Sequence, residues 1–156
     1  MARIDTEGMD DLISEMTRMG ELSGEVAKVM AAAAGAEIRG AWRESAEAHR
    51  LRKTGAMIES IGFPGPVQKI GDTVYQDVTA MGKDSKGTRN AEKAFVLNYG
   101  TSRIRPTHWV DEAEAAAGPR VQEKLEKIWG DFLETGKVPA VIDPGSTESG
   151  ITKTIK

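Results

Sequence analysis

The residues best suited to proton transfer or metal binding are His49 and His108, the only two histidines of the chain. Asp111 and Glu112 follow His108 by three and four positions, a spacing that can place a carboxylate beside the imidazole on one helix face. Two ligands do not make a metal site, and acids at a helix start already favour the positive end of its dipole. We therefore expect no bound metal, with His49 a solvated helix-end residue and His108 a capping or interface residue.

Nucleophilic catalysis and nucleotide binding have no motif in this sequence. The chain contains no Cys and no Gly-x-Ser-x-Gly elbow. Its glycine-containing stretches, 62–65 and 82–87, lack both the Gly-x-Gly-x-x-Gly fingerprint and the Gly-Lys-Ser/Thr of a phosphate loop. We expect no enzyme activity, no catalytic residues and no cofactor.

The distribution of charge is more informative than its total. The net charge of -3 argues against a protein devoted to binding phosphates. Two segments are nevertheless basic: residues 39–53 carry five basic and two acidic side chains, and residues 83–105 carry six and two. Such segments can face DNA or an acidic neighbouring subunit, the alternative being an ordinary solvated surface. The candidate residues are Arg39, Arg43, Lys83, Lys86, Arg89, Arg103 and Arg105.

A long helix must carry the first basic segment. Apolar residues recur in steps of three or four from Met9 to Trp42, as on one face of a helix. Gly20 and three later glycines each cost roughly 1 kcal/mol relative to Ala inside a helix, which predicts a bend near Gly20 or close packing against a neighbour. Thr54-Gly55 is predicted to end this helix, because glycine readily adopts the left-handed conformation.

A small antiparallel sheet of about four strands is predicted next. Turn residues at 64–66 and 71–72 separate apolar or alternating runs, which is typical of hairpins. The polar, glycine-containing stretch 82–90 reads as an exposed, mobile loop. The predicted strands are 58–63, 67–70, 73–81 and 93–99.

A closing helix and a tail complete the expected α+β fold. An apolar stripe from Trp109 to Phe132 predicts the helix, with Thr107 as its cap and a kink or restart at Gly118-Pro119. We expect one domain over 1–136 and an extended arm over 137–156, in which Ile151 and Ile155 could pair with a sheet edge during assembly. Neither a signal peptide nor a membrane anchor is expected.

The order of these elements and the residues at their junctions resemble the tail-component or tail-completion proteins of long-tailed bacteriophages. The resemblance covers about residues 9–133. Two features depart from it: in the family the aromatic directly follows the proline, whereas Thr107 and His108 intervene here, and the tail after Gly136 is an addition. The residues that carry it are Thr54, Gly55, Ser60, Ile61, Tyr99, Gly100, Thr101, Pro106 and Trp109.

This resemblance implies a structural virion protein without enzyme activity. Such a protein forms a homo-oligomeric ring, six-fold symmetry being one option, in the neck between capsid and tail. Its partners would be further copies of itself, neighbouring neck and tail proteins and the genomic DNA in the lumen, with no membrane, and it would occupy the host cytoplasm during assembly. A tail-terminator or head-completion protein is the alternative within this class, and a DNA-binding accessory protein is the alternative outside it.

Overall fold

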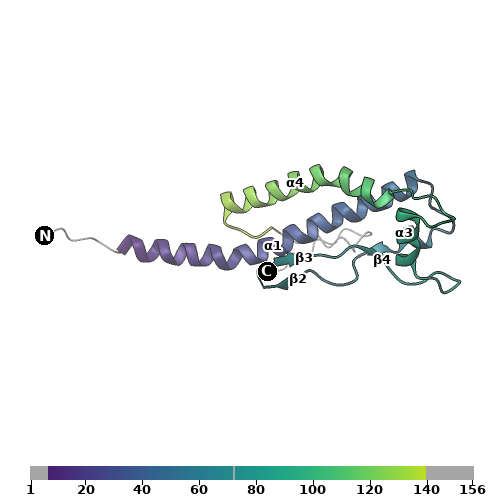
Figure 1. The fold of residues 1–156 in the computed structure, drawn as a ribbon. Coiled ribbons are helices and arrows are strands. Elements are labelled where there is room, and N and C mark those ends of the chain that lie inside the picture. The colour runs from purple at the N-terminus through teal and green to yellow at the C-terminus, as the bar shows by residue number, and fades with distance from the viewer. Residues whose placement is uncertain (1–6, 72, 140–156) are drawn as a thin grey trace, which may run out of the picture.

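The computed structural model describes residues 7–71 and 73–139 and has the expected α+β fold (Figure 1). The arm candidates Ile151 and Ile155 lie outside the described residues. None of the described helices is long and apolar enough to cross a membrane. The elements are α1 (Glu7–Ala48), α2 (Ala56–Glu59), β1 (Ile61–Gly62), β2 (Gln68–Ile70), β3 (Thr73–Tyr75), β4 (Thr79–Ala80), α3 (Asn90–Tyr99) and α4 (Trp109–Thr135).

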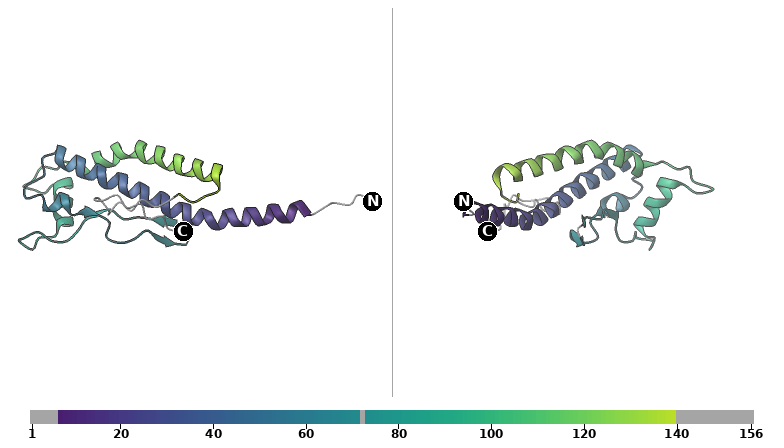
Figure 2. Two further views of the ribbon diagram at one scale, coloured as in Figure 1. Left: turned by 180° about the vertical axis from the view of Figure 1, so that it is seen from behind. Right: turned by 60° about the vertical axis from the view of Figure 1, so that its left-hand side comes forward.

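The body of the fold is an antiparallel pair of helices, α1 and α4 (Figures 1 and 2). Small side chains allow their close approach, since Ala41 of α1 packs in one buried cluster with Ala113 and Ala117 of α4. At the edge of this contact Lys124 Nζ lies 2.6 Å from Glu37 Oε1. The predicted restart of the last helix is wrong, because α4 continues uninterrupted through Pro119.

A second core joins the two-helix body to the remaining elements. Trp109, at the start of α4, is fully buried and lies edge-on to Trp42 of α1, with 5.6 Å between the ring centroids. Its indole N–H donates to the carbonyl of Ala94 in α3. Around it gather Ala46, Met57, Ile58, Ile61 and Ala80.

The described strands form two separate antiparallel pairs, β1 with β4 and β2 with β3. The predicted strand 58–63 is only partly right, because residues up to Glu59 belong to α2 and the strand is Ile61–Gly62. The predicted strand 93–99 is wrong and lies in α3. There Ala94 and Asn98 are buried four residues apart on one helix face, while Phe95 and Tyr99 are exposed.

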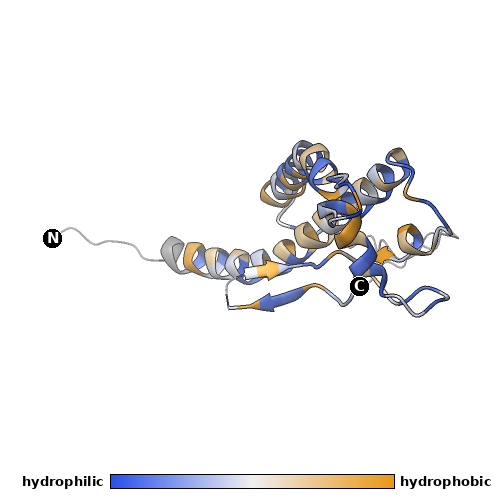
Figure 3. Cartoon of the chain, turned by 45° about the vertical axis from the view of Figure 1, so that its right-hand side comes forward, coloured by the Kyte–Doolittle hydropathy of each residue, from blue (hydrophilic) through white to orange (hydrophobic). Residues whose placement is uncertain are grey.

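The N-terminal part of α1 extends beyond the rest of the molecule (Figures 1 and 2). Residues 11–18, which we call the projecting segment, are all exposed. Figure 3 shows hydrophobic residues among the hydrophilic ones in this part of the helix. The helix continues without a break through Gly20. Close packing occurs at Gly35, where a Cβ would come within 2.8 Å of the Gln76 side chain.

Candidate interaction groove

The two basic segments meet at an open groove of about 830 Å³. Its walls are the connection between α1 and α2, the loop before α3, and α3 itself. We call it the basic groove. Its apolar lining is Leu51, Met57, Ile58, Val96, Leu97 and Ile104, and its charged lining is Arg50, Arg52, Lys53, Lys86 and Lys93 with Asp84 and Glu92.

Arg50 enters the groove from the end of α1. The amide of Arg50 donates to Glu47 O and that of Leu51 to Ala46 O, a pair of bonds that closes a helix in the Schellman manner. Arg50 takes the left-handed position with φ of 56°, which is usually reserved for glycine. The predicted helix end at Thr54-Gly55 is therefore wrong, and Gly55, with φ of 84°, instead precedes α2.

Asp84 organises the loop on the other side of the groove. One carboxylate oxygen accepts the amides of Lys86 at 2.9 Å and Thr88 at 2.8 Å, and the other forms an ion pair with Lys93. The Lys93 ammonium and the Thr88 amide lower the pKa of Asp84 below its ordinary value. The loop is largely exposed as predicted, except that Asn90 is buried and begins α3, and these bonds give it a defined internal structure.

Cations remain available on the groove wall after internal pairing. Arg52 pairs with Glu47 and Glu59, and Lys93 pairs with Asp84. Arg50, Lys53 and Lys86 form no ion pair with another residue in the described part of the chain. The groove thus combines an apolar lining with three cations and one acid, Glu92, that the described residues leave unpaired, so that it is net positive.

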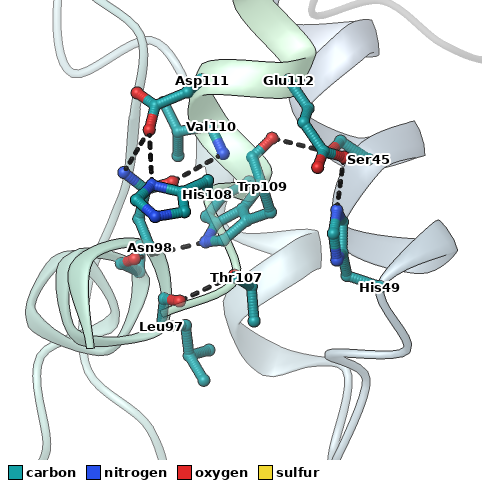
Figure 4. A network of polar contacts seen from close by, with 11 residues as sticks. Ser45, His49, Leu97, Asn98, Thr107, His108, Trp109, Val110, Asp111 and Glu112 are labelled. Atoms are coloured by element: carbon teal, nitrogen blue, oxygen red, sulfur yellow. Dashed lines mark hydrogen bonds and ion pairs between the residues drawn. The ribbon is translucent and has the colours of Figure 1, made fainter. Parts of the chain in front are cut away.

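A polar network fixes the α3 wall of the groove to α4 (Figure 4). The side-chain oxygen of Asn98, a residue only 1% exposed, accepts the amide of Val110 at 2.9 Å. This bond satisfies an amide in the first turn of α4 that has no partner within the helix. The predicted cap Thr107 acts differently, because its hydroxyl donates to Leu97 O at 2.7 Å.

Both histidines reach the first turn of α4 (Figure 4). His108 Nδ1 lies 3.0 Å from Asp111 Oδ2, which is the three-residue pairing expected from the sequence. His49 Nε2 lies 2.6 Å from Glu112 Oε2 and so ties the end of α1 to α4. No group of three or more His, Cys, Asp or Glu among the described residues is arranged to hold a metal ion.

Gly100 makes the turn between α3 and α4 possible. It has φ of 74° and ψ of -179°, a conformation essentially restricted to glycine. A Cβ there would lie 2.6 Å from Ile104 O and 2.7 Å from Pro106 N. The Tyr-Gly-Thr-Ser motif therefore ends a helix, not the strand expected from the sequence.

The candidate cations of the sequence are dispersed over the fold. Arg43 is directed inward, since its guanidinium donates to Ile61 O at 2.7 Å and Glu59 O at 3.3 Å. Arg39 lies 5.2 Å from the centre of the Phe63 ring. Lys86 lines the groove, while the others lie on exposed loop positions: Lys83, Arg89, Arg103 and Arg105.

Sequence reasoning missed Arg50 and Lys53 as individual site residues, although both lie in the basic segment 39–53. The signal that could have singled them out is their position on either side of Leu51-Arg52, between a helix end and Gly55. Comparison of the chain with protein-family models, with curated proteins and with solved structures finds no match in any of the three.

Proposed function

We propose that this chain is a structural component of the neck of a long-tailed bacteriophage, where its copies form a ring that joins or completes the tail at the head–tail interface. The observation that carries the proposal is the projecting segment. Its apolar side chains Leu12, Ile13 and Met16 are 58%, 56% and 66% exposed. An apolar stripe on a helix without a partner is typical of a surface that another protein chain covers.

The energetic case rests on the number of side chains in this stripe. Fully burying one Leu, Ile or Met side chain contributes about 1.5–3 kcal/mol. Three such side chains per copy, repeated at every contact of a ring, offset part of the entropy lost on assembly. The described residues leave this stripe exposed, and the proposed assembly would bury it.

The proposed place of this assembly, the neck, rests on the resemblance of the sequence to tail-completion proteins. The junction residues Gly55, Gly100, Thr101 and Pro106, and a long first helix followed by short strands and a closing helix, resemble tail-completion proteins. On this proposal the partners are other copies of the chain, adjacent neck and tail proteins, and the DNA that passes through the lumen. The protein then resides in the virion neck and has no catalytic role. A tail-terminator or head-completion protein would form a comparable ring at another level.

Purified virions provide the test. Mass spectrometry and antibody labelling in electron micrographs should detect the protein at the neck, in a constant number of copies per particle. The double variant Leu12→Ser/Met16→Ser should fold but fail to join particles, whereas Ser14→Asn in the same segment should be incorporated normally. A chain that is absent from particles and remains strictly monomeric at all concentrations would contradict the proposal.

A DNA-binding accessory protein is a second candidate, which the unneutralised Arg50, Lys53 and Lys86 of the basic groove favour. Binding that depends on phosphate contacts weakens steeply as salt concentration rises. Fluorescence anisotropy with a labelled DNA duplex between low and physiological salt tests this candidate. Binding that the triple substitution of these cations by Ser does not change would argue against it.

A further inference from the structure

We propose that the projecting segment of one copy docks into the basic groove of the next copy, so that the protein assembles head to tail. This inference rests on the proposed assembly role and specifies which two surfaces meet between neighbouring copies. The two surfaces lie at opposite ends of the molecule: α1 projects on one side, and α3 lies on the other (Figures 1 and 2). Residues of α3 line the groove. The segment therefore meets a groove only on another copy.

The projecting segment has a suitable apolar face. At helical spacing Leu12, Ile13 and Met16 form one stripe, and all three are more than half exposed. Asp11 and Glu15, four residues apart, border this stripe on the side of Leu12. Glu15 is ion-paired with Arg18 of the same segment at 2.8 Å, so Asp11 is the acid of this border that forms no ion pair with the described residues. The segment is thus an amphipathic helix with an acidic border, the kind of helix that lies in an apolar groove of a partner.

The basic groove has the matching features. Its lining includes half-buried Leu51, Val96 and Leu97, and Ile104 at its edge is 42% exposed. Arg50, Lys53 and Lys86 supply the positive charge opposite the acidic border. Apolar contact at the centre with opposite charges at the edge gives affinity through burial and fixes the register of the helix through charge.

The symmetry of this contact agrees with the proposed ring. Because segment and groove are different surfaces, each copy uses one of each with its two neighbours. Such a heterologous contact closes into a ring if its rotation closes, and extends into a filament if it does not. Pairing of two projecting segments would instead stop at a symmetric dimer.

Chemical cross-linking tests the contact directly, because the natural chain contains no Cys. A copy with Met16→Cys is mixed with a copy of different mass that carries Ile104→Cys, and a short bis-maleimide is added. The control replaces Ile104→Cys with Glu123→Cys, an exposed site on α4. We expect heterodimers with Ile104→Cys at a clearly higher yield than with Glu123→Cys. Equal yields, or links only between two Met16→Cys copies, would overturn the proposal.

Charge exchange provides a second, independent readout. Arg50→Glu/Lys53→Glu should weaken the specific cross-linking by about fivefold or more, because two opposite-charge contacts become repulsive. Asp11→Lys/Glu15→Lys on the other copy should restore it. Circular dichroism of each variant confirms that it is folded. Absence of rescue, or a groove that binds duplex DNA while cross-linking stays at the control yield, would count against docking.

The two proposals can fail separately. Detection of the protein in virions together with control-level cross-linking would leave the neck assignment standing and overturn this contact. Specific and charge-dependent cross-linking of a protein that is absent from virions would support this contact and overturn the neck assignment.

Discussion

The side-chain oxygen of Asn98, near the end of α3, accepts the backbone N–H of Val110 in the first turn of α4 at 2.9 Å. The cap of α4 therefore comes from a different helix, 12 residues earlier in the chain. Together with the bonds of Thr107 to Leu97 O and of the Trp109 indole to Ala94 O, this bond holds the α3 wall of the basic groove against the two-helix body.

Asn98→Ala should lower the free energy of unfolding by about 1–3 kcal/mol, because it leaves the Val110 amide without an acceptor in a buried setting. Asn98→Asp retains the acceptor but should also lose stability, because it buries a carboxylate beside Asp111, which in the natural chain accepts from the Asn98 amide nitrogen. Urea denaturation of both variants measures the effect, with the exposed substitution Ser85→Ala as the reference. A loss no larger than that of Ser85→Ala would mean that this cap contributes nothing.

Gly100→Ala should destabilise the protein by about 1–3 kcal/mol, because alanine cannot adopt its backbone conformation without strain and the Cβ would meet backbone atoms. Gly130→Ala serves as the matched control. Gly130 lies inside α4, and a Cβ there meets nothing within 4 Å. The Gly130→Ala substitution should stabilise the helix by about 0.5–1 kcal/mol. Thermal or urea unfolding that gives both substitutions the same sign would contradict the assignment of Gly100.

Arg43→Ala should cost about 1–3 kcal/mol of stability, because its guanidinium bonds to the carbonyls of Glu59 and Ile61 are lost. The triple variant Lys83→Ser/Lys86→Ser/Arg89→Ser should stay within about 0.5 kcal/mol of the natural chain, because all three residues are exposed. Chemical unfolding of the two variants distinguishes the inward cation from the surface cations. Equal losses would show that this division is wrong.

Arg50→Gly should stabilise the fold by about 0.5–1 kcal/mol, because glycine relieves the left-handed conformation that closes α1. The same variant removes a cation from the basic groove and should therefore weaken docking. Lys53→Gly removes a neighbouring cation at a residue whose φ is not positive. Because no backbone strain is relieved there, this substitution should slightly lower stability. The comparison separates backbone strain from charge, and a loss of stability in Arg50→Gly would refute the strain assignment.

The ion pair of Asp84 with Lys93 gives the stability of the chain a defined dependence on pH. The pKa of Asp84 is lowered in the folded state, so its contribution is fully present above the ordinary aspartate value and is lost as pH falls through the lowered value. The stability difference between the natural chain and Asp84→Asn should therefore shrink below about pH 3.9. Asp77→Asn, at an exposed site, provides the comparison. A difference that stays constant with pH would contradict the role of the carboxylate.

The sequence predicted the α+β class and both long helices because their apolar residues repeat over many turns. It failed where local signals conflicted. The segment around Phe95 and Val96 has residues that favour strands, but burial of Ala94 and Asn98 on one face selects a helix. The end of α1 was missed because Arg50, not a glycine, occupies the left-handed position.

The candidate site was only partly visible in the sequence. Local counting identified two basic segments, which meet at the groove through Arg50, Lys53 and Lys86. It could not separate Arg43, whose charge serves backbone carbonyls within the fold, from cations on the surface. That distinction depends on contacts between residues 16 and 18 positions apart, which no local pattern records.

The uninterrupted length of α1 sets the distance between the projecting segment and the basic groove. Its 42 residues span about 63 Å at about 1.5 Å per residue, and it carries the projecting segment near one end and leads directly into the basic groove at the other. In a head-to-tail assembly this length sets the spacing of neighbouring copies, and the helical phase sets their rotation. A natural variant that gained or lost residues within α1 would change the diameter of the proposed ring, even if every contact residue were retained.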